Sequence, residues 1–180
     1  MKAFIAFLLA AAPLCASPDP RPTPSPATLK SILLEQFQTT HANQDWFVPA
    51  SKAVEGLTAD QAAWKDGNAN HSIAQLVSHL IFWDTEQLAR LQGKPVPPYS
   101  GRNDDTFNAS LNEASWDQMV KDLDRILTDW EKAIASADDG TIQKWASSIA
   151  HVSAHNAYHT GQILYIRKQQ GSWDPEKGVR

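Results

Sequence analysis

The chain has little cysteine and little glycine, with one cysteine and eight glycines among 180 residues. The single cysteine, Cys15, cannot build a disulfide framework, and its place near the N-terminus leaves no thiol for catalysis in the rest of the chain. The few glycines form no glycine-rich phosphate-binding loop. These absences exclude disulfide-stabilised scaffolds, thiol enzymes and P-loop nucleotide-binding proteins.

Basic residues are fewer than acidic ones, with 16 lysines and arginines against 20 aspartates and glutamates. Removing Lys2 with the leader described below leaves 15 basic residues against the same 20 acidic ones. The sequence also has no basic stripe with interleaved aromatic residues, which is typical of nucleic-acid-binding surfaces. We therefore expect no nucleic-acid partner.

The N-terminus has the layout of a secretory signal peptide. Met1 and Lys2 precede the apolar run AFIAFLLAAAPL, and the small residues CAS follow it. The run is too short to cross a bilayer comfortably, and Pro13 interrupts it, so a cleaved leader is favoured over a transmembrane anchor in the mature chain. We expect a signal peptide over residues 1–17, cleavage near Ala16 or Ser17, and a secreted or periplasmic protein.

Prolines alternate with other residues after the leader, in the segment SPDPRPTPSP. This pattern favours an extended spacer, assigned here to residues 18–27. Residues 28–180 have the length of one domain with one core. Apolar residues recur there at three- and four-residue intervals in four segments: Thr28–Val48, Ser72–Leu91, Trp116–Ala137 and Thr141–Gln170. The sequence therefore predicts an all-α protein, an antiparallel four-helix bundle.

The segment HVSAHNAYHTGQI places His155 and His159 four residues apart within the predicted apolar face of the last helix. Residues four apart share one helix face, which suits two ligands of one metal ion. His79 lies at the edge of the apolar face of the second predicted helix. A buried imidazole needs either a hydrogen-bond partner or a metal. The three histidines are therefore read as a metal site, with ordinary core histidines as the alternative.

Three stretches of the chain, EGLTADQAAWK, SIAQLVSHLIFWD and HNAYHTGQI, resemble the DinB-like superfamily of four-helix bundles, which includes metal-dependent hydrolases of the YfiT type. The resemblance covers most of the chain after the spacer. It implies that His79, His155 and His159 bind a divalent metal. Some enzymes of the family use small intracellular thiols, and an exported protein would not meet that thiol pool, so the resemblance argues little for thiol transfer here.

Several further residues are candidates for a role near the predicted metal site. Among the acids, Asp45 and Glu86 are read as solvated surface charges, whereas Asp84 stays a candidate because it lies nearer its apolar stripe. Tyr158 and Gln162 flank the histidine pair and are candidates for orienting substrate or water.

The remaining histidines are given non-ligand roles. His41 is expected to be exposed, His71 to lie in a turn or cap before the second helix, and His151 to lie at a polar edge. Core packing accounts for the tryptophans on the apolar stripes, which are Trp83, Trp116, Trp130 and Trp145.

Three imidazoles leave coordination positions open for water or substrate, and nitrogen ligands suit zinc, nickel, iron or manganese. The leading hypothesis is a divalent-metal-dependent hydrolase acting on a small molecule. The alternative is a non-catalytic metal-binding or interaction module of the cell envelope. No catalytic residue is assigned, and homodimerisation through a face of the bundle stays open.

Overall fold

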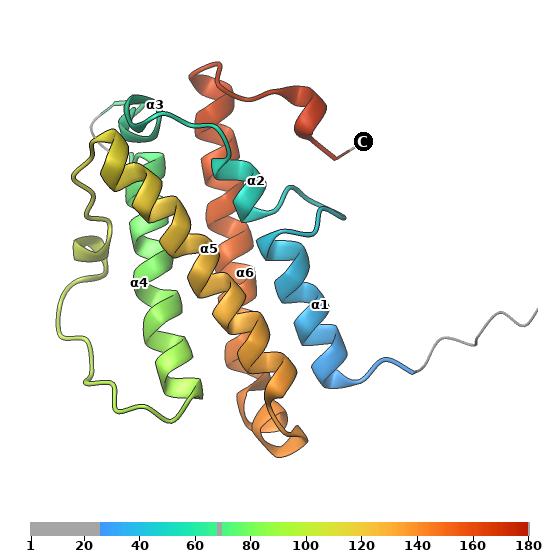
Figure 1. The fold of residues 1–180 in the computed structure, drawn as a ribbon. Helices are drawn as coiled ribbons and strands as arrows, with labels where there is room; N and C mark the ends of the chain where they lie inside the picture. Colours follow the sequence, from blue (N-terminus) through green and yellow to red (C-terminus); the bar gives the residue numbers. More distant parts are fainter. Residues whose placement is uncertain (1–25, 68–69, 180) are drawn as a thin grey trace, which may run out of the picture.

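The computed structural model describes residues 26–67 and 70–179, and in this part of the chain all regular elements are helices. Four long helices form a bundle: α1 (Leu29–His41), α4 (Ile73–Leu91), α5 (Glu113–Ser136) and α6 (Asp139–Gln169) (Figure 1). The short helices α2 (Ala50–Val54) and α3 (Ala59–Ala63) join α1 to α4. The prediction of an all-α four-helix bundle is confirmed. The predicted leader and most of the spacer lie outside the described residues.

The four long helices pack so that α1 and α4 each contact both α5 and α6. Helices α4 and α5 run in one direction, and α1 and α6 run in the other (Figure 1). Because α4 and α5 are parallel neighbours, residues 92–112 must return along the whole bundle between them. This long connection contains the 3-10 turn η1 (Asn103–Thr106), which contacts α4.

Each of the four long helices begins at a residue whose side chain caps it. The Ser72 side chain accepts a hydrogen bond from the backbone N–H of Gln75, and the Gln75 side chain accepts one from the backbone N–H of Ser72. Helix α4 therefore starts where predicted. Helix α5 starts three residues before the predicted Trp116, because Asn112 and Ser115 form a capping box there. Asp138 caps α6.

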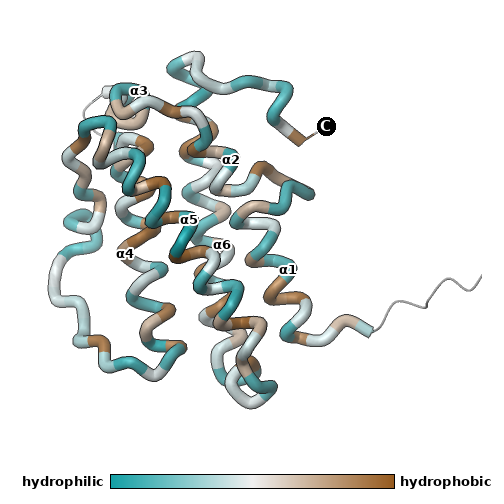
Figure 2. The backbone as a smooth tube through the Cα atoms, viewed as in Figure 1, coloured by the Kyte–Doolittle hydropathy of each residue, from teal (hydrophilic) through white to brown (hydrophobic). Residues whose placement is uncertain are grey.

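The interior is formed by the apolar faces of these helices. Apolar and polar segments alternate along every long helix, as expected for amphipathic helices around one core (Figure 2). Trp116 and Trp130 are completely buried, whereas Trp83 and Trp145 are only half-buried, so the core assignment holds for the first two. None of the helices within residues 26–67 and 70–179 is long and apolar enough to span a membrane.

The first predicted helix is wrong beyond residue 41. Helix α1 ends at His41, residues 42–47 are exposed, and α2 begins after Pro49. Phe47, beyond the end of the helix, is 37% exposed, and Leu29 and Ile32 in the first turn of α1 are 43% and 50% exposed. Asn43 and Asp45 have low helix propensity, because their side chains compete for backbone hydrogen bonds, and the turn lets α2 pack against α5 and α6.

The expected exposure of His41 is also wrong. His41 is buried against α5. Its Nδ1 lies 2.6 Å from Glu131 Oε1, and its Nε2 lies 3.1 Å from Asp124 Oδ1. Two carboxylate partners compensate the loss of hydration of the ring. Helical periodicity could not reveal this, because both partners lie about 90 residues away along the chain.

A second buried polar group, the Arg167 guanidinium, joins α6 to α2 and to the C-terminal segment. Its Nη1 donates to the carbonyl oxygens of Ala53 and Glu55 at 2.8 and 3.0 Å, and its Nη2 donates to that of Ser172 at 2.8 Å. The side chain is nearly inaccessible to water, and its guanidinium carbon lies 5.2 Å from the centre of the Trp173 ring.

Replacing Arg167 with methionine should lower the free energy of unfolding by about 2–3 kcal/mol, because the variant leaves buried carbonyl groups without donors. Urea denaturation followed by circular dichroism measures the change. Arg90→Met is the matched control, since Arg90 makes only a surface ion pair with Glu86, which should contribute no more than about 0.5 kcal/mol. An equal loss in the two variants would contradict the structural role of Arg167.

Candidate metal centre

Three predicted ligands come together between α4 and α6. His79 projects from the second turn of α4, and His155 and His159 project from adjacent turns of α6. The Nε2 atom of His155 lies 3.1 Å from Nε2 of His79 and 3.0 Å from Nε2 of His159. Two nitrogens bound to one zinc ion at about 2.0–2.1 Å each lie at most about 4.2 Å apart. Both distances fall within that limit, and the three histidines are grouped closely enough that they could hold one metal ion.

The outer nitrogens of two of these rings are held by hydrogen bonds. His79 Nδ1 lies 2.6 Å from Thr106 Oγ1, and the Thr106 hydroxyl donates its own hydrogen to the carbonyl oxygen of Asn103. His159 Nδ1 lies 2.6 Å from the amide oxygen of Gln162. Because the hydroxyl and the amide oxygen act as acceptors here, both histidines carry their hydrogen on Nδ1. Their Nε2 lone pairs then point toward His155.

Burial keeps all three rings neutral. Desolvation, followed by repulsion from the neighbouring imidazoles, lowers the pKa of His79 to about 3, and the same two causes lower the pKa of His155 to about 4. Burial also lowers the pKa of His159, although its bond to Gln162 partly opposes the shift. Neutral imidazole is the form that binds metals.

The three neutral imidazoles together have too few N–H hydrogens to satisfy the contacts of all their ring nitrogens. With the Nδ1 hydrogens of His79 and His159 used by Thr106 and Gln162, only His155 has a hydrogen to place between the three Nε2 atoms. One hydrogen cannot serve both Nε2 to Nε2 contacts. A cation at the centre would satisfy all three lone pairs, so the residues present fit a divalent metal.

Aromatic stacking holds the cluster from the side of the long connection. The Phe107 ring stacks on His79 with 3.9 Å between centroids and on His71 with 3.8 Å. His71 thus lies just before α4, as predicted, but it also takes part in a three-ring stack. Sequence reasoning missed Thr106 and Phe107, because residues 92–112 have no periodicity that would place them next to α4.

The other candidate residues differ in whether they contact the clustered histidines. Gln162, predicted to orient substrate or water, accepts a hydrogen bond from His159. Tyr158, given the same prediction, is 63% exposed, and its hydroxyl accepts a hydrogen bond from Gln162. His151 is exposed, as expected. Asp45 is exposed, and Glu86 pairs with Arg90.

Asp84, the remaining acidic candidate, is buried in the bundle. Its Oδ1 accepts a hydrogen bond from Asn156 Nδ2 at 3.2 Å, while its Oδ2 has no hydrogen-bond partner. Desolvation raises the pKa of Asp84 to about 8, although the bond from Asn156 opposes the shift. The carboxyl group is therefore mostly protonated at neutral pH. Asp84 and Asn156 thus form a buried polar pair between α4 and α6.

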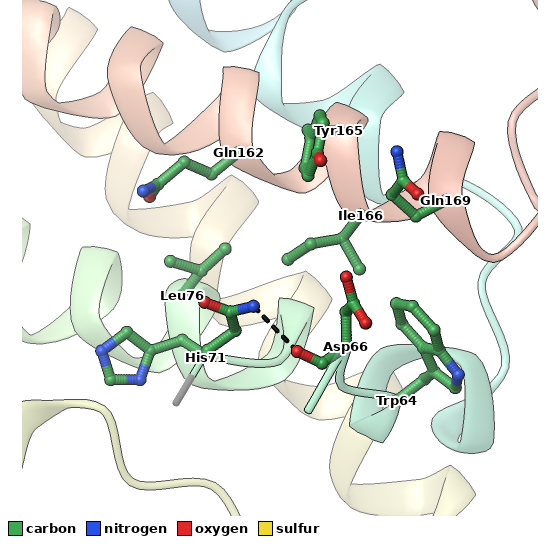
Figure 3. Close-up of a pocket in the computed structure, with 9 residues that line it drawn as sticks. Trp64, Asp66, His71, Leu76, Gln162, Tyr165, Ile166 and Gln169 are labelled. Atoms are coloured by element: carbon green, nitrogen blue, oxygen red, sulfur yellow. Dashed lines mark hydrogen bonds between the residues drawn. The ribbon is translucent and has the colours of Figure 1, made fainter. Parts of the chain in front are cut away.

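Two pockets flank the cluster. One, of about 290 Å³, is lined by the ligand candidate His155 together with Trp83, Asp84, Gln87, Asn103, His151 and Val152. The other, of about 280 Å³, is shown in Figure 3, where Trp64 and Asp66 face Tyr165, Ile166 and Gln169 of α6. The second pocket reaches Gln162 and His71 but none of the three clustered histidines.

The fold and the site together define an all-helical bundle with a buried cluster of three neutral histidines. A family model described as the DinB superfamily matches residues 50–163, which is more than half of the chain and includes all three histidines. The chain therefore belongs to the DinB superfamily, as the sequence resemblance indicated. No curated protein and no solved structure matches it.

Proposed function

We propose that the protein binds one divalent transition metal ion through His79, His155 and His159. The observation that carries this proposal is that the Nε2 atoms of His79 and His159 lie 3.1 and 3.0 Å from Nε2 of His155, in a cluster that lacks the hydrogens to satisfy them. Nitrogen ligands of this kind suit zinc, nickel, iron or manganese. Thr106 and Gln162 support the site, because ligand histidines generally donate their second N–H to such acceptors.

We further propose that the protein is a metal-dependent hydrolase acting on a small molecule. A divalent ion with an open coordination position supplies Lewis-acid activation of a carbonyl and makes hydroxide available near neutral pH. Within the chain, Thr106 and Gln162 hold the two buried imidazoles in place. His155 is only half-buried and lines a pocket, so a small molecule can approach the centre from its side.

A second candidate function is a non-catalytic metal-binding module of the cell envelope. The near-complete burial of His79 and His159, which are 2% and 6% exposed, favours it. In this case the ion would join α4 to α6 and would act on stability alone.

The first test is the metal content of the purified protein after exchange into metal-free buffer, measured by elemental analysis. We expect about one transition metal ion per chain, because three protein ligands are the usual number in a metal site that keeps one position open for water or substrate. His155→Ala and the double variant His155→Ala, His159→Ala should lose most of it.

His151→Ala is the matched control, since it removes an exposed histidine one helical turn from His155 and should keep the metal. Circular dichroism verifies that each variant is folded. A wild-type protein that takes up no zinc, nickel, iron(II) or manganese would refute the metal site and leave the histidines as core residues.

The hydrolase proposal predicts that metal-loaded protein cleaves small esters, lactones or amides, and that a chelator stops the reaction until metal is restored. His155→Ala should lower kcat/KM by at least about 100-fold, because Lewis-acid activation provides several kcal/mol of transition-state stabilisation. Stoichiometric metal that raises the melting temperature without any hydrolysis would favour the module instead.

We also propose that the protein works outside the cytoplasm, on the strength of the leader pattern in residues 1–17. Mass spectrometry of the chain purified from its native host should find an N-terminus near Ser17. Recovery of a chain that begins at Met1 or Lys2 would contradict export with cleavage.

A further inference from the structure

The three clustered histidines differ in their exposure to solvent. His79 and His159 are 2% and 6% exposed, whereas His155 is half-buried. Of the two pockets that flank the cluster, the one between α4 and α6 near η1 includes His155 in its wall. We call it the Trp83 pocket. A molecule that approaches a metal ion on the cluster therefore passes along this wall.

The Trp83 side chain is held in a fixed orientation at this pocket. Its Nε1 donates a hydrogen bond to Asn103 Oδ1 at 3.2 Å. Its ring makes edge-to-face contacts with Phe82 and Tyr99, with centroid distances of 5.1 and 5.8 Å. An aromatic wall that is already ordered binds a planar group without a large entropic cost. Val152 adds an aliphatic surface from α6.

The charge of the Trp83 pocket also restricts its ligand. Its lining residues include no lysine or arginine. Its one acidic residue, Asp84, is buried, and burial raises the pKa of Asp84 to about 8. A phosphate or carboxylate group would find no basic side chain of the usual kind here. The amides of Gln87 and Asn103 can bind neutral polar groups.

The neighbouring pocket in Figure 3 has a different character. Its lining includes the exposed carboxylate of Asp66, and it touches the site only through Gln162 and His71, which lie outside the ligand set. The Trp83 pocket is thus the one that combines a ligand histidine, an ordered aromatic wall and a lining without lysine or arginine.

We propose that the Trp83 pocket is the substrate pocket of the metal centre, and that it selects a neutral small molecule with an aromatic or other planar group beside a carbonyl oxygen. This inference rests on the proposed metal site and adds the substrate class to it. Trp83 and Val152 contact the planar group, and the carbonyl oxygen faces the centre at His155.

Hydroxamates test this selection without any turnover, because the hydroxamate oxygens bind the ion and the substituent occupies the pocket. Binding is measured on cobalt(II)-loaded protein by the change in visible absorption. Benzohydroxamate should bind about tenfold more tightly than acetohydroxamate, which matches the free energy of one aromatic contact. The 4-carboxy derivative should lose most of this advantage, because no lysine or arginine lines the pocket.

Trp83→Ala should remove the preference for the aryl compound and leave acetohydroxamate binding unchanged. Tyr165→Ala is the matched control, because it removes an aromatic ring from the wall of the neighbouring pocket and should keep the preference. Trp83 bonds to Asn103, whose carbonyl holds Thr106, so Trp83→Ala could disturb the metal site. Val152→Trp is therefore the second variant: it fills the pocket and should block benzohydroxamate while cobalt stays bound.

The outcomes separate the inference from the proposed function. A wild-type protein that binds no cobalt refutes the metal site and this inference with it. Bound cobalt without an aryl preference, equal or tighter binding of the 4-carboxy compound, or a preference lost in Tyr165→Ala but kept in Trp83→Ala and Val152→Trp would overturn the Trp83 pocket alone.

Discussion

The meeting of three partly or fully buried imidazoles between α4 and α6 is the constraint on which the site depends. Desolvation keeps the rings neutral, so their lone pairs cannot be satisfied by taking up protons at neutral pH. Thr106 and Gln162 fix two of the rings with those lone pairs turned inward. A structure that only needed to bury histidines could have bonded each ring nitrogen separately, as it does for His41.

The topology of the bundle supplies the supporting groups. Because α4 and α5 run in the same direction, the chain between them returns along the bundle and lays Thr106 and Phe107 against His79 (Figure 1). The same connection brings Asn103 to Trp83. A short turn between antiparallel neighbours would leave that side of α4 without these contacts. One crossover thus orders both a metal-ligand candidate and the wall of the adjacent pocket.

The buried polar groups of the bundle serve two different purposes. Arg167 and His41 are bonded on several sides and join helices that are distant in the sequence. Asp84 keeps an oxygen without a partner, and the His155 ring is only half-covered. Groups with several partners stabilise a fold, whereas incompletely satisfied ones beside a pocket are the kind of group that a ligand can engage.

Local pattern in the sequence determined the helices α4, α5 and α6 to within a few residues, as well as the shared face of His155 and His159, because helix periodicity and capping act over three or four residues. Only the tertiary structure decided the end of α1, the burial of His41, the support from Thr106 and the half-buried place of Trp83 at a pocket. These features depend on partners far apart along the chain, most of them on a connection without periodicity. Which groups meet there is decided by how the helices pack and in which direction each one runs.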